Sequence, residues 1–145
     1  MSLHSKLLQL AFLCAFLVSC KTQNSVSESI NNQLQSGATR IDMRGMATAF
    51  AWDKMYVFAP YSPKDEMCKK IGLSPRQCSN SNLTSADEGE FVLVFVHSGA
   101  ITHVEHFSRK IGNFDESERC AAVPIGIDKA LFKVERKNGF LLICD

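Results

Sequence analysis

The hydrophobic pattern is clearest in residues 91–96, six consecutive apolar residues that predict a buried β-strand. Ser98-Gly99 follows as a tight turn, and residues 101–107 are typical of a strand that returns antiparallel to the first. This segment therefore predicts a β-hairpin.

A second hairpin is predicted near the C-terminus. Residues 130–136 and 140–144 are separated by Lys137-Asn138-Gly139, and Asn-Gly strongly favours a hairpin turn.

Upstream, residues 40–43 and 49–58 have the pattern of extended structure. Met55 and Val57 alternate with Tyr56 and Phe58, so we expect the second of these segments to be buried on both faces over part of its length.

A helix is predicted after that strand. Ser62 is suited to cap it, Pro63 suits its first position, acidic residues follow, and Gly72 ends it. Together the patterns predict an α+β fold, with an antiparallel sheet of about five strands and one or two short helices.

The N-terminal pattern is different. Residues 7–18 are apolar apart from one glutamine, a run too short to span a bilayer but of the length found in secretory signal peptides. Leu17-Val18-Ser19-Cys20 resembles the lipobox of bacterial lipoproteins.

The lipobox resemblance implies that residues 1–19 are a cleaved signal peptide and that Cys20 carries the lipid that anchors the protein in a membrane. Lys21 resembles the outer-membrane sorting pattern, so the resemblance implies an outer-membrane lipoprotein on the periplasmic face.

Residues 20–38 are mostly polar, and we interpret them as a solvated tether that precedes a single domain at residues 39–145. The alternative is a short helix at residues 27–35, because Val26, Ile30 and Leu34 are spaced four residues apart.

The charge balance argues against a protein that binds nucleic acid or an anionic membrane through its charges. Removal of residues 1–19 takes away one of 16 basic residues and none of 15 acidic ones, which leaves 15 of each. Because both signs are interspersed, the chain lacks the basic block of a nucleic-acid-binding protein. No cofactor-binding motif is present.

Four cysteines remain in the predicted domain: Cys68, Cys78, Cys120 and Cys144. In an exported protein they predict two disulfides, with three connectivities possible. We favour Cys68–Cys78 and Cys120–Cys144. A zinc site is the competing interpretation, but no Cys-x-x-Cys pair is present.

The histidines and acidic clusters do not predict a metal site. In a hairpin with Ser98-Gly99 as its loop, His97 and His106 share one face about 20 Å apart, while His103 points to the other. The clusters at residues 87–90 and 115–118 do not match a calcium-binding loop. We interpret them as solvated turns.

The most distinctive stretch runs from Trp52 to Tyr61. It resembles the Trp-Asp-x-x-Tyr-Val-Phe-x-Pro-Tyr signature of a group of small bacterial lipoproteins, which implies a small mixed fold without implying an activity. Trp52, Asp53, Tyr61 and Arg109 are our candidate binding surface, with Asp53 paired to Arg40, Arg44 or Arg109. The alternative is that Trp52 is a core residue and Asp53 a structural ion-pair partner.

These patterns predict a non-enzymatic binding or accessory module of the cell envelope, with an envelope protein or a glycan as partner. An apolar patch that includes Tyr61 is the expected binding surface. The alternative is an inhibitor or immunity protein that blocks a cell-wall hydrolase. An enzyme is a third hypothesis, and it requires a cleft joining Asp53, Arg109 and His106.

Overall fold

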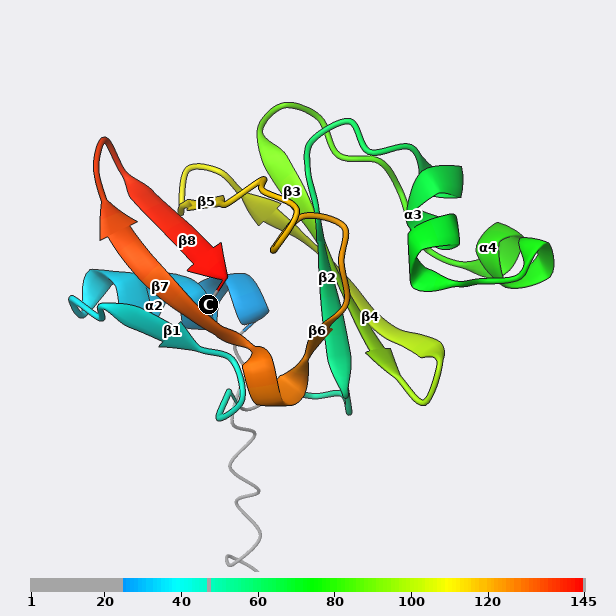
Figure 1. Cartoon of the computed structure of the whole chain (residues 1–145), viewed down its shortest axis with the longest axis horizontal. Helices are drawn as coiled ribbons and strands as arrows, with labels where there is room; N and C mark the ends of the chain where they lie inside the picture. The colour runs from blue at the N-terminus through cyan, green and yellow to red at the C-terminus, as the bar shows by residue number, and fades with distance from the viewer. Residues whose placement is uncertain (1–24, 47, 145) are drawn as a thin grey trace, which may run out of the picture.

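The computed structural model describes residues 25–46 and 48–144. This part of the chain is an α+β domain with eight strands in two four-stranded sheets, where the sequence predicts one sheet of about five strands. The first sheet has the strand order β1-β7-β8-β5 and the second β4-β3-β2-β6 (Figure 1). The helices are α2 (Val26–Gln35), α3 (Lys64–Ile71) and α4 (Pro75–Asn80), with a 3₁₀ turn η1 (Ile127–Lys129).

The second sheet is built around the predicted hairpin of β3 (Glu90–His97) and β4 (Ala100–Ser108). Its turn is Ser98-Gly99, with both residues at positive φ. On the other side of β3 lies β2 (Lys54–Phe58), antiparallel to it, followed by the two-residue strand β6 (Ile125–Gly126). In this sheet β4 has no described partner strand along its outer edge.

The first sheet contains the predicted C-terminal hairpin, formed by β7 (Leu131–Arg136) and β8 (Phe140–Cys144). Strand β1 (Arg40–Asp42) adds antiparallel to β7, and β5 (Asn113–Phe114) adds parallel to β8.

Two hydrophobic clusters occupy the two faces of β2 and β3. Met55 and Val57 join the larger cluster, which also contains residues of α2 and the first sheet. Tyr56 and Phe58 join a smaller cluster, which contains Met67 of α3. The prediction that β2 is buried on both faces is therefore confirmed.

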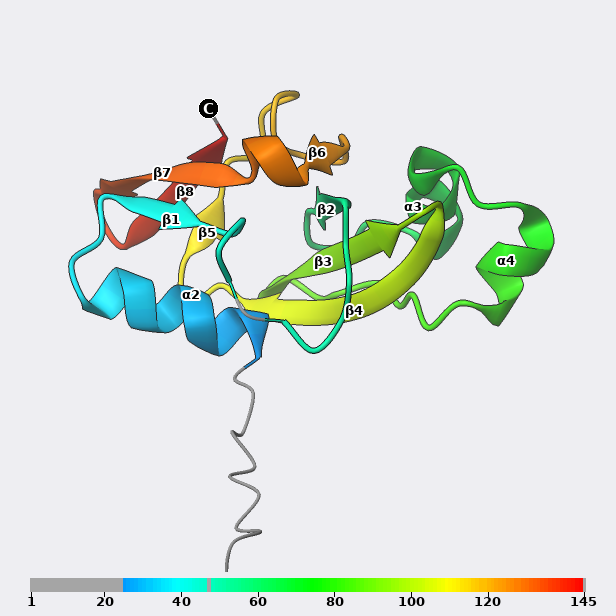
Figure 2. The same ribbon diagram turned by 90° about the horizontal axis from the view of Figure 1, so that it is seen from below.

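Helix α2 corrects the tether interpretation for residues 26–35, whereas residues 20–24 lie outside the described residues. Val26, Ile30 and Leu34 are at most 3% exposed and belong to the larger core cluster. Their spacing of four places them on one helix face, and Figure 2 shows α2 packed beneath the first sheet. The described part of the chain begins with Ser25, which caps α2 by accepting a hydrogen bond from the backbone N–H of Glu28.

Glu105 of β4 holds the first turn of α2. Its carboxylate accepts hydrogen bonds from the backbone N–H groups of Val26 (3.2 Å) and Ser27 (2.7 Å), and it lies 3.0 Å from Nε2 of His103. Burial by itself would raise the pKa of Glu105, but hydrogen bonds from Ser27, His103 and Val26 outweigh it and lower the pKa below its ordinary value.

We expect Glu105→Gln to lower the free energy of unfolding by about 1–2 kcal/mol at pH 7, because the charge-assisted bonds to α2 are lost. Since the folded-state pKa is depressed, this stabilisation is complete above the unfolded-state value of about 4.3 and disappears as the pH falls through the folded-state value. Denaturant unfolding at pH 7 and at a series of lower pH values measures how the difference in free energy of unfolding between wild type and variant shrinks. Glu118→Gln is the matched exposed control. A gap that stays constant on acidification would contradict this assignment.

The disulfides are Cys68–Cys78, which joins α3 to α4, and Cys120–Cys144, which joins the segment before β6 to the end of β8. This is the pairing favoured from the sequence. Helix α3 stops at Gly72, as predicted, and this glycine is in the left-handed conformation. The N-cap of α3 is Pro63 and not Ser62. The hydroxyl of Ser62 donates to the carbonyl of Ala59 instead.

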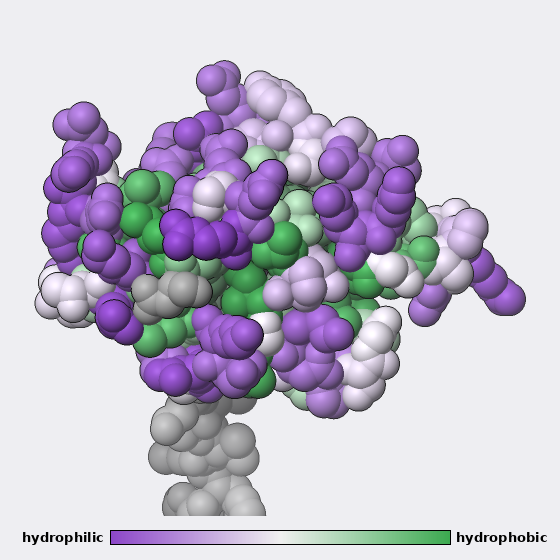
Figure 3. Space-filling model, viewed as in Figure 1, coloured by the Kyte–Doolittle hydropathy of each residue, from purple (hydrophilic) through white to green (hydrophobic). Residues whose placement is uncertain are grey.

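Hydrophilic side chains cover most of the face seen in Figure 3, and hydrophobic ones show near its centre. Among the described residues, the large hydrophobic side chains that are well exposed are Tyr61 (65%) and Ile127 (36%). Tyr61 follows the end of β2, whereas Ile127 follows β6, which pairs with the start of β2. The two side chains therefore lie at opposite ends of β2 and do not form the patch expected around Tyr61.

Candidate functional site

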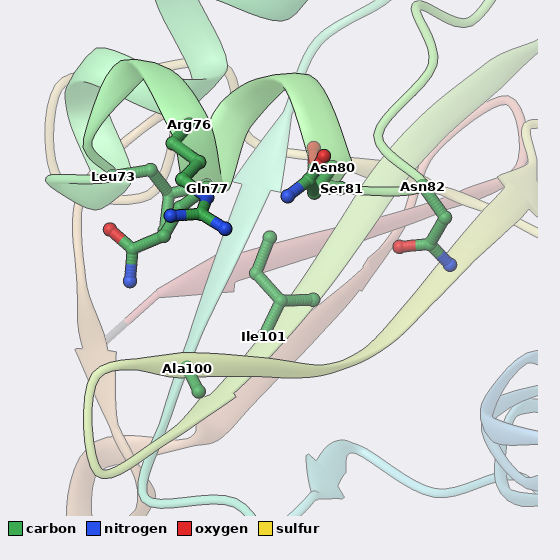
Figure 4. Close-up of a pocket in the computed structure, with 8 residues that line it drawn as sticks. All are labelled: Leu73, Arg76, Gln77, Asn80, Ser81, Asn82, Ala100 and Ile101. Atoms are coloured by element: carbon green, nitrogen blue, oxygen red, sulfur yellow. The ribbon is translucent and has the colours of Figure 1, made fainter.

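A groove of about 440 Å³ lies between α4 and the tip of the β3–β4 hairpin. In Figure 4, Arg76 and Gln77 extend from α4 on one side, and Ile101 points from β4 toward that helix. The groove is lined by Leu73, Arg76, Gln77, Asn80, Ser81, Asn82, Ala100 and Ile101. We call it the α4 groove.

Polar groups of the α4 groove are available to a ligand. Within the described residues, the structure gives no hydrogen bond or ion pair to the side chains of Arg76, Asn80 or Asn82, all of which are exposed. Arg76 is the one charged residue in the lining. Leu73 and Ile101 add an apolar strip, so the groove combines one guanidinium, side-chain amides and hydrocarbon.

The polar wall of the groove is held in place before any ligand binds. Ser74 and Gln77 form a capping box, in which the Ser74 hydroxyl accepts from the Gln77 backbone N–H and the Gln77 side chain accepts from the Ser74 backbone N–H. The Cys68–Cys78 disulfide joins α4 to α3, and Lys64 Nζ donates to the carbonyl of Ser81 at 3.0 Å. Because a short helix of this kind is weak in isolation, these bonds fix its orientation.

A chain of three polar groups braces the segment that follows the groove. Thr84 Oγ1 lies 3.0 Å from His106 Nε2, and His106 Nδ1 lies 2.9 Å from Glu90 Oε2. Hydrolases use the same order of hydroxyl, imidazole and carboxylate, with a substrate cleft over the hydroxyl. Here Thr84 is exposed and outside the α4 groove, and the chain links residues 81–86 to β4 and β3.

The histidine prediction was wrong in its details, because the β3–β4 register shifts by one residue between Phe95 and Val96. After this bulge His103 lies opposite Phe95 and His106 opposite Val92, so His97 and His103 share a face and His106 lies on the other. Each histidine has its own carboxylate neighbour, respectively Asp53, Glu105 and Glu90. The described residues contain no cluster of three or more metal-ligating side chains.

The four residues predicted as a binding surface do not meet. Trp52 is 8% exposed and packs edge-on against Phe95 in the larger core, as the alternative interpretation expected. Asp53, next to it, precedes β2.

Asp53 was predicted to pair with an arginine. In the structure its Oδ2 accepts from the Ser98 backbone N–H at 2.7 Å and lies 3.4 Å from His97 Nδ1, while Arg44 pairs with Asp42. Asp53 therefore belongs to the hairpin-turn end of the sheet.

Arg109 lies at the other end of this sheet. It bonds to the side chain of Asn113 and the carbonyl of Glu88, and its guanidinium lies over the Phe91 ring. Tyr61 is at that end too, since its N–H bonds to the carbonyl of Ala86. Asp53, Arg109 and His106 are thus not brought together in the arrangement that the enzyme hypothesis required.

The sequence analysis predicts no helix at residues 75–80, where α4 lies, and the α4 groove was missed for that reason. A local signal was present: Ser74-Pro75-Arg76-Gln77 has the spacing of a capping box with proline at the first helical position.

Cys20 and the predicted signal peptide lie outside the described residues. Within residues 25–46 and 48–144, the structure contains no helix long and apolar enough to span a membrane. Comparison of the chain with protein-family models, with curated proteins and with solved structures gives no match.

Proposed function

We propose that this protein is a lipoprotein, anchored at Cys20 on the periplasmic side of the bacterial outer membrane, whose domain binds an extended, carboxylate-bearing segment of an envelope protein in the α4 groove. The groove carries the binding part of this proposal: a guanidinium and two amide side chains without described partners stand beside an apolar strip. The signal-peptide and lipobox patterns support the anchor.

The chemistry of the groove favours a polypeptide over a glycan. Side-chain amides offer both donors and acceptors, which match the backbone of an extended peptide, and Leu73 and Ile101 suit an apolar side chain. Sugar rings are commonly recognised by aromatic faces, and the groove lining contains no aromatic residue.

The charge of the groove indicates what the segment carries. Arg76 presents a planar fork of N–H donors, which binds a carboxylate in bidentate geometry. Because no acidic residue lines the groove, an aspartate, a glutamate or a C-terminal carboxylate of the partner would meet no like charge there.

Charge reversal at Arg76 tests the site. We expect Arg76→Glu to weaken partner binding by at least about tenfold, because it removes a charge-assisted pair and opposes the partner's carboxylate. Arg119→Glu, an exposed residue outside the groove, is the matched control and should leave binding unchanged. The readout is photocrosslinking in whole cells from a reactive residue at Asn80. If the Arg76→Glu and Arg119→Glu proteins form the partner adduct in equal yield, the proposed site is contradicted.

The identity of the crosslinked protein separates the two functions that the sequence left open. A cell-wall hydrolase would identify the domain as an inhibitor or immunity protein. A structural or assembly protein of the envelope would identify it as an accessory module.

A further inference from the structure

We propose that the domain lies directly against the bilayer through the surface around the start of α2, so that one defined face is turned toward the lipid. This inference rests on the proposed anchor at Cys20. It goes beyond that anchor because it assigns an orientation and a lipid-facing surface.

The length of chain between the anchor and the domain carries the first step. Ser25 is fixed as the N-cap of α2, and in the proposed mature lipoprotein only five residues, 20–24, precede it. Fully extended, five residues span at most about 18 Å. A domain of this size has a radius of gyration of about 14 Å, so the linker is shorter than the domain is wide. The surface around Ser25 must therefore remain close to the membrane.

The hydrogen bonds at the start of α2 prevent the linker from gaining length at low cost. Glu105 binds the N–H groups of Val26 and Ser27, and Val26 itself is 3% exposed in the core. Unwinding the first turn to lengthen the linker would break these bonds and expose apolar surface.

The surface around Ser25 is formed by three segments that lie on one side of the domain. A small pocket of about 180 Å³ is lined by Ser25 and Val26 at the start of α2, by residues 48–50 of the loop between β1 and β2, and by His103 and Glu105 of β4. Figure 2 shows the start of α2, this loop and β4 together along the lower side of the domain.

The chemistry of this surface suits a lipid neighbour. Residues 46–52 contain no charged residue, and Ala49 and Ala51 are exposed there while Phe50 is partly exposed and stacks on the His103 ring at 4.2 Å. Glu28 is the one charged residue of α2. The carboxylate of Glu105 in β4 also belongs to this surface, but its side chain is 13% exposed and accepts hydrogen bonds from the α2 backbone beside His103. Because few charges would lose water or face anionic head groups, this side can approach a bilayer at low electrostatic cost.

The orientation leaves the proposed binding site accessible. Figure 2 shows α2 and α4 at opposite ends of the domain. A lipid contact around Ser25 therefore does not cover the α4 groove, and a partner can reach the groove from the periplasm.

Vesicles that contain a diazirine-bearing phosphatidylcholine test the orientation. The purified lipoprotein is reconstituted in vesicles of phosphatidylethanolamine and phosphatidylglycerol with this probe, irradiated, and its labelled peptides are mapped by mass spectrometry. We expect labelling in residues 48–51 and in the exposed side of α2, with little at Asn80 or Lys133. Ten Gly and Ser residues inserted between Gln23 and Asn24 should reduce the labelling about fivefold, because the linker becomes three times as long.

The same spectra separate failure of the anchor from failure of the orientation. An N-terminal peptide without acyl chains on Cys20 would overturn the anchor and the orientation together. An acylated peptide with labelling spread evenly over the domain, or unchanged by the longer linker, would overturn the orientation alone.

Discussion

Replacing Ile30 with alanine should lower the free energy of unfolding by about 3–4 kcal/mol. Ile30 lies at the centre of the buried face of α2, is 0% exposed, and packs in the cluster that also holds the first sheet. Truncation removes three carbon atoms from a closely packed site, so the loss of burial adds to the cavity left behind. A tether would show no such effect, because its side chains would be solvated in both states.

Denaturant unfolding monitored by circular dichroism measures this change. Asn32→Ala is the matched control on the exposed side of the same helix, and we expect its effect to stay within about 0.5 kcal/mol. A destabilisation below about 1 kcal/mol for Ile30→Ala would show that α2 contributes little to the domain, and it would restore the tether interpretation.

Replacing Cys120 and Cys144 with alanine removes their disulfide and should lower the free energy of unfolding by about 3–4 kcal/mol. The bridge closes a loop with a sequence separation of 24, and the chain-entropy model assigns about 3.5 kcal/mol to such a loop. It joins the segment before β6 to the last strand, so it ties the second sheet to the first. Both cysteines are also buried in the larger core.

The matched comparison is the double variant Cys68→Ala and Cys78→Ala. Its disulfide closes a loop with a sequence separation of 10, to which the chain-entropy model assigns about 3 kcal/mol of stability. We expect its effect to centre on α3 and α4, which the bridge joins, and hence to reduce binding in the α4 groove. Amide hydrogen exchange, measured in both double variants, distinguishes loss of protection in α3 and α4 from loss of protection elsewhere in the domain. Equal loss of protection in α4 for both variants would contradict the separate roles.

The elements predicted correctly are those specified by neighbouring residues. Residues 91–96 and their return strand form a hairpin because both segments and the turn are contiguous, and the same holds for the hairpin closed by Asn138-Gly139. The two-sheet arrangement depends on pairing across long sequence separations. Strand β1 pairs with β7, and β5 adds parallel to β8 through only two residues, which gives no detectable pattern.

The errors have local physical causes. Residues 26–35 read as a tether because most of the segment is polar, although three apolar residues suffice to fix one face of a ten-residue helix. The bulge in β4 moved His103 and His106 by one register position, and no residue in the hairpin marks that irregularity in the sequence.

The candidate site was predictable only in part. The sequence allows Trp52 to be either a binding residue or a core residue, and its exposure of 8% places it in the core. The α4 groove depends on how close α4 lies to Ala100 and Ile101, and the sequence does not give that distance.

Photocrosslinking in living cells from two positions tests whether the α4 groove is the binding site: Asn80 lies in the groove and Lys133 on the exposed side of β7. We predict one defined envelope-protein adduct from Asn80 and none from Lys133. The same adducts from both positions, or none from Asn80 in a folded and correctly localised protein, would contradict the claim that the groove is the binding site.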